Sequence, residues 1–234
     1  MPKYLFLNPI LLLLALSAFP QDVPMPIAFE HLSVAEGLSS KEVKCMAQDQ
    51  KGFMWFGTYD GLNRYNGYSF DVFRSNPQNE HSLRDNNIYS LLVDSKNTLW
   101  IGTKYGGLSR FQTESETFDT WIHNPHNPQS LSSNWVLSLF ENKDGTLWIG
   151  TGDGLNKLVI KQKTKKQPYN EASFVRYDTP SGLPLKINRI ANLFDDHYLW
   201  LSTSQGLIKF NTQSGVFERI YFNPHTIPAK INLM

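Results

Sequence analysis

Four tryptophan-centred copies of one short motif constrain this chain more than any other feature of its sequence. They follow one another at intervals of 45, 48 and 52 residues, and they are Trp55–Thr58, Trp100–Thr103, Trp148–Thr151 and Trp200–Thr203. Self-similarity with a period of roughly 40–50 residues is typical of β-propellers, in which each repeat forms one blade. We therefore interpret the rest of the sequence by its place in this repeat.

The agreement between the copies extends to both sides of the tryptophan. A Gly-Leu pair follows each copy, and an apolar residue precedes it by ten to twelve positions. A glycine stands two residues after the first three tryptophans, where Ser202 replaces it in the fourth copy: Gly57, Gly102 and Gly150. We expect these glycines to let neighbouring backbones approach closely.

Each repeat is predicted to form four strands joined by short turns. In the first repeat the expected strands are 43–49, 53–58, 62–65 and 68–73. Asn66-Gly67 predicts a two-residue hairpin turn in which both residues have a positive φ. Both alternating sets of side chains are apolar over Phe53–Phe56, so both faces of that strand should be buried, as in a blade between two others.

The sequence therefore predicts an all-β protein whose β-propeller blades are four-stranded antiparallel meanders. The expected parts are a signal peptide at 1–21 and a partial propeller at 22–234, with an outer strand at 27–33 and blades at 43–73, 88–122, 136–178 and 190–221. A lone outer strand at the start normally completes the last blade of a closed ring. Here the fourth repeat has an outer strand of its own, Phe217–Tyr221, so we expect an incomplete propeller of about four repeats.

The first residues resemble a secretory signal. Lys3 precedes the apolar run Ile10–Leu16, and the small residues Ser17 and Ala18 follow it. The run is shorter than the roughly 20 residues that a membrane-spanning helix needs. We expect export to the periplasm and no membrane span in the mature chain, with an uncleaved anchor as the alternative.

Charge and cysteine content exclude several classes of function. The net charge of +1 gives no electrostatic reason to expect a nucleic-acid partner. The one cysteine, Cys45, lies in an apolar strand and is expected to be buried and unreactive.

Candidate chemical groups in the sequence favour structural roles. His123 and His126 have no Cys or carboxylate cluster nearby, so no metal site is expected. An aspartate before the turn in each of the first three repeats should hydrogen-bond backbone N–H groups, and the three are Asp49, Asp94 and Asp144. No nucleophile or phosphate-binding pattern is present, so we expect neither an enzyme nor a cofactor. The lysines of 161–166 predict a solvated loop, with an anionic glycan contact as the alternative.

The repeat, with its Leu-Trp-Ile-Gly-Thr core and the Asn-Pro connectors at 76–83 and 124–131, resembles the two-component regulator propeller family. That resemblance covers roughly residues 27–225. It implies the extracytoplasmic sensor region of a bacterial hybrid two-component histidine kinase, often one that detects glycan breakdown products. No kinase motif accompanies the repeats, so the resemblance implies a truncated input region.

Ligand contacts are expected where the repeats differ, in the turns between the second and third strands. These turns supply mixed aromatic and charged groups suited to a small saccharide, and the candidates are Tyr59, Asp60, Lys104, Tyr105 and Asp153. We expect Tyr59 and Tyr105 to hold the sugar, whereas the alternative makes all five ordinary exposed turn residues.

Two other functions remain open at this stage. Propellers also serve as lyases and hydrolases, so the chain could be a fragment of an enzyme. It could also be an interaction piece, closed into a ring by another copy of itself or by a partner chain.

Overall fold

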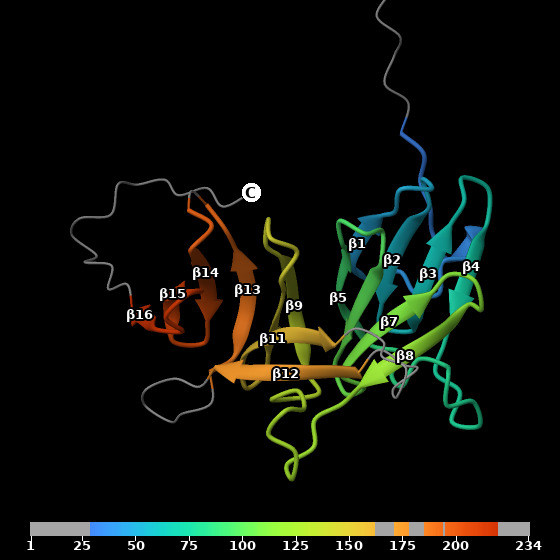
Figure 1. Ribbon diagram of the computed structural model, residues 1–234. Coiled ribbons are helices and arrows are strands. Elements are labelled where there is room, and N and C mark those ends of the chain that lie inside the picture. Colours follow the sequence, from blue (N-terminus) through green and yellow to red (C-terminus); the bar gives the residue numbers. More distant parts are fainter. Residues whose placement is uncertain (1–28, 162–170, 178–184, 194, 220–234) are drawn as a thin grey trace, which may run out of the picture. The chain divides into compact units, whose positions relative to one another are not determined.

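The computed structural model describes residues 29–161, 171–177, 185–193 and 195–219 (Figure 1). Contacts divide the chain into two units, residues 1–31 and 32–234, and the fold below is that of the second unit. The predicted signal peptide lies outside the described residues. None of the described segments forms a helix long and apolar enough to cross a membrane.

Within these residues the strands form four separate antiparallel sheets of four strands each. The first two sheets contain β1 (Val43–Gln48), β2 (Met54–Thr58), β3 (Gly61–Tyr65), β4 (Phe70–Phe73), β5 (Ile88–Val93), β6 (Leu99–Thr103), β7 (Leu108–Gln112) and β8 (Thr117–Trp121). The other two contain β9 (Val136–Glu141), β10 (Leu147–Thr151), β11 (Gly154–Lys161), β12 (Glu171–Tyr177), β13 (Ile187–Ala191), β14 (Tyr198–Thr203), β15 (Gly206–Asn211) and β16 (Phe217–Arg219). In each sheet the strands pair in sequence order, so every repeat is one meander and one blade. The predicted fold class is confirmed.

The sheets span 43–73, 88–121, 136–177 and 187–219. The predicted blades were 43–73, 88–122, 136–178 and 190–221. Residue 178 of the third predicted blade and residues 220 and 221 of the fourth lie outside the described ranges. The fourth blade begins three residues earlier than expected because Ile187 pairs with Thr203. Val43 pairs with Thr58 in the same way in the first blade, so Ile187 is the equivalent position and Ile190 is not.

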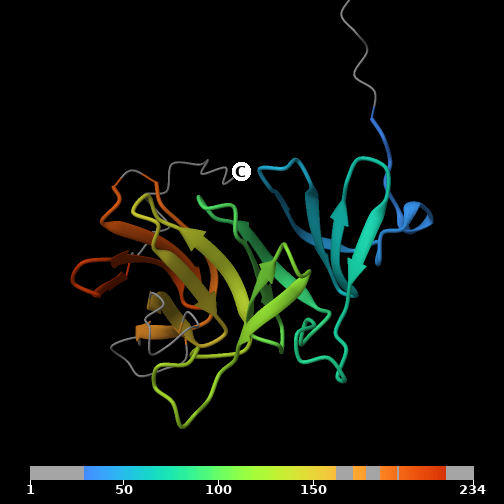
Figure 2. The same ribbon diagram turned by 45° about the vertical axis from the view of Figure 1, so that its right-hand side comes forward.

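The first strand of each blade packs beside the first strand of the next. These inner strands touch in the order β1, β5, β9 and β13, whereas no comparable contact joins β13 back to β1 within the described part of the chain (Figures 1 and 2). The four sheets therefore form an incomplete propeller.

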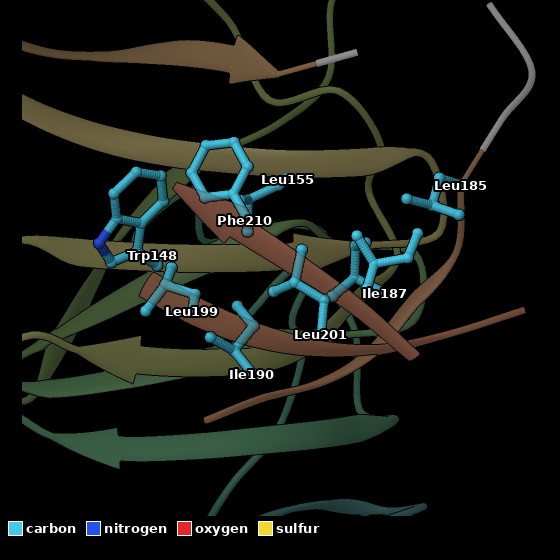
Figure 3. Close-up of a cluster of buried hydrophobic side chains, with 9 residues drawn as sticks. Trp148, Leu155, Leu185, Ile187, Ile190, Leu199, Leu201 and Phe210 are labelled. Carbon is cyan, nitrogen blue, oxygen red and sulfur yellow. The ribbon is translucent and has the colours of Figure 1, made fainter. Parts of the chain in front are cut away.

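A tryptophan from each of the first three blades fills the space between that blade and the next. Trp148 of the third blade packs beside Leu199 and Phe210 of the fourth, as Figure 3 shows. Trp55 occupies the same place against the second blade, and Trp100 against the third. Because β6 and β10 each have a blade on both sides, every residue in them is buried.

The glycine two residues after each of the first three repeat tryptophans lies where neighbouring inner strands meet. A Cβ on Gly57 would lie 2.5 Å from Cys45 Sγ and 2.6 Å from Ile88 Cγ2 of the next blade. A Cβ on Gly150 would lie 2.7 Å from Ile187 Cγ2. These distances leave no room for a side chain, so glycine permits this spacing of the blades.

Both faces of the strand around Phe53–Phe56 were expected to be buried, and this prediction is wrong for one face. Trp55 is 2% exposed, whereas Met54 and Phe56, on the opposite face, are only half-buried. Successive side chains of a strand alternate between the two faces of a sheet. The Phe56 face has no neighbouring blade within the described residues, and it therefore keeps part of its apolar surface in contact with solvent.

The predicted two-residue turn at Asn66-Gly67 is also wrong. Tyr65 pairs with Phe70, so the loop contains four residues, and Gly67 has a positive φ while Asn66 does not. The side chain of Asn66 determines this geometry: its Oδ1 accepts hydrogen bonds from the backbone N–H groups of Tyr68 and Ser69 at 2.8 and 2.9 Å. An asparagine side chain that binds backbone two residues ahead stabilises such a turn by itself.

No strand forms at 29–33, where an outer strand was predicted from 27 to 33, and residues 27 and 28 lie outside the described ranges. A short 3-10 turn, η2 (Val34–Glu36), follows instead. Ser33 accepts a hydrogen bond from the N–H group of Ala35, and Glu36 accepts one from that of Ser33. This reciprocal pairing is a capping box. It favours a turn because it satisfies, within the segment itself, backbone N–H groups that in a strand would need a neighbouring strand as acceptor.

The aspartates of the first three repeats are not equivalent. Asp49 and Asp94 each accept a hydrogen bond at 2.9 Å from the indole N–H of the tryptophan six residues later. The residue six before Trp148 is Asn142, and its backbone makes the same turn contacts. Asp144 instead accepts from the backbone N–H of Thr146 at 2.9 Å, so its placement in the aspartate series was wrong.

Candidate functional site

The turns between the second and third strands lie at one end of the blades, and a threonine stabilises each of them. The Oγ1 atom of Thr58 accepts a hydrogen bond from the N–H group of Asp60, and Thr151 does the same for Asp153, both at 3.0 Å. In the second blade the N–H group of Gly106 donates to Thr103 at 2.9 Å. The fixed threonine holds the backbone, so the residues between threonine and glycine are free to vary.

Tyr59 is one wall of a cation–aromatic sandwich. The ammonium group of Lys44 lies 3.4 Å from the centre of the Tyr59 ring and 3.5 Å from that of Tyr89. The same ammonium donates a hydrogen bond to Asn87 Oδ1 at 3.2 Å. Lys44 and Tyr59 belong to the first blade and Tyr89 to the second, so the sandwich connects two blades.

A second set of such contacts surrounds Trp135. The Trp135 ring meets the edge of Tyr89, with 5.8 Å between ring centres. The ammonium group of Lys186 lies 4.4 Å from the centre of the indole, and that of Lys104 lies 6.0 Å from it. Lys104 also lies 4.9 Å from the ring centre of Tyr105.

These contacts join four successive blades into one surface, which we call the aromatic–lysine face. Its members are Lys44, Tyr59, Tyr89, Lys104, Tyr105, Trp135 and Lys186. Tyr59 and Tyr105 are 46% and 66% exposed, which leaves much of both rings available to a ligand. In each blade, the first strand starts near the turn that joins the second strand to the third. Residues that are far apart in sequence therefore meet at this surface.

Three of the five residues predicted as ligand contacts belong to this face: Tyr59, Lys104 and Tyr105. Asp60 instead forms an ion pair with Arg74 at 2.9 Å. Asp153 is exposed, and its carboxylate makes no ion pair with any described residue.

Sequence reasoning missed Lys44, Tyr89, Trp135 and Lys186. Each of them directly flanks the repeated apolar position at the start of an inner strand, which is the one sequence signal that could have identified them.

The lysines of this face are not neutralised by acidic side chains. Among the described residues, no carboxylate lies within ion-pair distance of Lys44, Lys104 or Lys186. A hydrogen bond with Tyr105 raises the pKa of Lys104 above its ordinary value, so this group is charged at neutral pH. The face therefore presents positive charge beside aromatic rings.

An open cleft of about 1070 Å³ lies elsewhere, at the second blade. It is lined by the β7–β8 hairpin and the connector around His81, and it shares no residue with the aromatic–lysine face. Arg110 and Asp119 in its wall form an ion pair at 2.6 Å.

The remaining candidate groups take part in local structure. His123 contacts the Leu131 carbonyl through Nδ1 at 2.7 Å, and the N–H group of His126 donates to Asn124. Burial raises the pKa of the Cys45 thiol to about 12, so the thiol stays protonated. No three His, Cys, Asp or Glu side chains gather to hold a metal in the described ranges. Lys163, Lys165 and Lys166 lie outside them.

Comparison with known proteins agrees with the repeat. The family "Two component regulator propeller" matches residues 37–60, 82–105 and 130–153, which confirms the resemblance inferred from the sequence. A segment of 55 residues is 38% identical to the histidine kinase P4 of Formosa agariphila, and it covers 24% of this chain and 4% of that protein.

Two solved structures from B. thetaiotaomicron have the same fold. One is the extracellular domain of a protein described as the hybrid two component system BT3049, with a TM-score of 0.70 at 24% identity over 82% of this chain. The other is the extracellular domain of BT4673, described as a one component system, with a TM-score of 0.62 at 22% identity over 83% of this chain. The chain spans 26% and 27% of these structures. Virginiamycin B lyase from Staphylococcus aureus also matches, with a TM-score of 0.50 at 14% identity over 75% of this chain and 54% of the lyase, so the fold also serves an enzyme.

Proposed function

We propose that this chain, which carries two component regulator propeller repeats, is an exported sensor region that binds a small saccharide at its aromatic–lysine face. Export to the periplasm is part of the proposal, and the extracellular domains among the matched structures support it. The proposal is one of binding and not of catalysis.

One observation carries the proposal. Four successive blades direct aromatic and cationic side chains to one surface, although these residues come from different repeats and differ between them. A framework role would favour the same residue type at equivalent positions, as with the buried tryptophans. Rings with polar edges suit a saccharide because the apolar faces of sugars stack on aromatics while their hydroxyl groups form hydrogen bonds.

Calorimetric titration with a panel of oligosaccharides tests this function. We expect at least one saccharide to bind, and the double substitution Tyr59→Ala and Tyr105→Ala to weaken its binding about ten- to a hundredfold, the equivalent of losing roughly 1–3 kcal/mol of contacts.

Tyr68→Ala is the matched control, because Tyr68 is a 96% exposed tyrosine in the hairpin between β3 and β4. Unchanged affinity in the double variant, or an equal loss in the control, would contradict the proposal.

A further inference from the structure

The three ammonium groups of the aromatic–lysine face differ in how well their hydrogen bonds are satisfied. Lys44 is held between two rings and donates to Asn87. Lys104 forms a hydrogen bond with Tyr105 and lies near its ring, and Lys186 contacts the Trp135 ring. An ammonium group carries three donors, so these contacts leave further donors of Lys104 and Lys186 to solvent or to a ligand.

These two lysines lie near the same aromatic ring. Their ammonium groups are 4.4 and 6.0 Å from the centre of the Trp135 indole, which is itself half-buried. A ligand that stacks on the accessible part of this indole would therefore meet two positive charges.

A ligand at this position must replace the water that solvates the two ammonium groups, and this requirement determines which ligand charge is favourable. A neutral sugar would take water away from the ammonium groups without supplying a countercharge, and uncompensated desolvation of a charge is unfavourable. A carboxylate or sulfate would replace that water with charge-assisted hydrogen bonds, which are about twice as strong as neutral ones. The absence of a carboxylate partner for these lysines among the described residues leaves this role to the ligand.

We infer that the ligand of the aromatic–lysine face is an anionic saccharide, whose carboxylate or sulfate groups are bound by Lys104 and Lys186 beside Trp135. The inference rests on the proposed saccharide-binding function and specifies its ligand class. Single-stranded nucleic acid also combines anionic groups with stacking bases. A net charge of +1 gives the molecule little long-range attraction for such a polyanion, so a saccharide is favoured.

The test compares acidic oligosaccharides with matched neutral ones. The panel contains oligomers of galacturonate, glucuronate and mannuronate, their methyl esters, sulfated galactose oligomers, inorganic sulfate and a thymidine oligonucleotide. We expect an acidic oligomer to bind at least about tenfold more tightly than its own ester, and its affinity to fall as salt concentration rises.

The variants Lys104→Gln and Lys186→Gln locate the charge requirement. Each should weaken binding of the acidic oligomer about tenfold, with little effect on the neutral ester. Lys96→Gln is the control, because this exposed lysine lies in the turn between β5 and β6, at the opposite end of the blade. Circular dichroism melting curves of all three variants establish that each is folded.

The outcomes separate this inference from the function on which it rests. Equal binding of acid and ester, unchanged affinity in both lysine variants, or binding of inorganic sulfate as tight as that of the oligomer would overturn the anionic-saccharide inference and leave saccharide binding intact. Preference for the oligonucleotide would replace it with nucleic-acid binding. If no saccharide of either kind binds, the proposed function itself is overturned.

Discussion

At the scale of single residues, a buried indole needs an acceptor for its N–H group, and the repeats meet this need unequally. Trp55 and Trp100 donate to Asp49 and Asp94, whereas Trp148 Nε1 is buried and has no hydrogen-bond partner among the described residues. The equivalent residue of the third blade, Asn142, directs its amide N–H to the Asp196 carbonyl at 3.2 Å. An unsatisfied buried donor carries the desolvation cost of the group, about 1–3 kcal/mol.

We expect Asp94→Ala to lower the free energy of unfolding by about 2–4 kcal/mol, because the substitution removes three hydrogen bonds and leaves the Trp100 indole unpaired. Asp94 accepts from the N–H groups of Lys96 and Thr98 as well as from Trp100. Urea denaturation followed by tryptophan fluorescence measures the loss. Asp144→Ala is the control and should cost about 1 kcal/mol, because its exposed side chain binds the backbone and side chain of Thr146 and holds no buried indole. Equal losses in the two variants would contradict the assignment.

In the third blade the residue type misled the prediction, because an asparagine holds the position that an aspartate holds in the first two. Asp144 is an aspartate like Asp49, but it lies one residue before its turn glycine, whereas Asp49 and Asn142 each lie three residues before theirs. In each of these turns the residue at the aspartate position donates its backbone N–H to the carbonyl of the residue four positions later. In the third blade this donor is Asn142, whose N–H binds the Thr146 carbonyl. The interval of six residues to the tryptophan also relates Asn142 to Asp49 and Asp94, so spacing was the correct guide here and residue type was not.

At the scale of the strand, the fit between blades depends on the glycine that lies two residues after each of the first three repeat tryptophans. A Cβ on Gly102 would lie 2.5 Å from Val136 Cγ1 of the next blade and would collide with Ser90 Oγ in its own. We expect Gly102→Ala to lower the free energy of unfolding by about 1–3 kcal/mol, since overpacking forces neighbouring side chains out of their preferred rotamers. The same denaturation measurement applies.

Gly152→Ala is the control for this substitution. Its Cβ would approach Trp135 no closer than 3.3 Å, so a smaller loss is expected. A loss at Gly102 no larger than that at Gly152 would contradict close packing of the inner strands.

Strands could be predicted where the same local sequence pattern recurs in several repeats. Turns were harder to predict where a single side chain determines the conformation of the loop. The central strands β6 and β10 repeat the motif Leu-Trp-Ile-Gly-Thr, and both were recognised from sequence. The loop after Tyr65 depends on the Asn66 side chain, which overrode the expected two-residue turn.

The same limit applies to the candidate site. Tyr59 and Tyr105 stand out as variable residues within a constant turn, whereas Trp135 and Lys186 reach the site from the starts of inner strands in other blades. No local pattern relates residues that meet only through the stacking of sheets.

At the scale of the whole molecule, the first and fourth blades carry opposite halves of one interface. In the three internal interfaces a tryptophan of one blade packs against apolar residues of the next. The first blade leaves Met54 and Phe56 half-buried on the face where no tryptophan of the described residues packs. In the fourth, Leu199 and Leu201 pack against the third blade, so Trp200 points to the opposite face, where it is half-buried.

These two faces predict self-association of the chain. A second copy could place its Trp200 against Phe56 by the geometry already used three times within the chain. Two such contacts related by a two-fold axis would close a ring of eight blades, the upper end of the usual range for propellers. We expect dimers at micromolar concentration, measured by light scattering after size-exclusion chromatography.

Substitutions on the two faces distinguish this dimer from other association. Phe56→Glu and Trp200→Glu should each yield a monomer, because a buried carboxylate without a partner opposes the contact. Tyr68→Glu, at a 96% exposed position in a hairpin, introduces the same charge and should leave the dimer intact. A monomeric wild-type chain would rule out closure by a second copy. A dimer that survives both face substitutions would place the interface elsewhere.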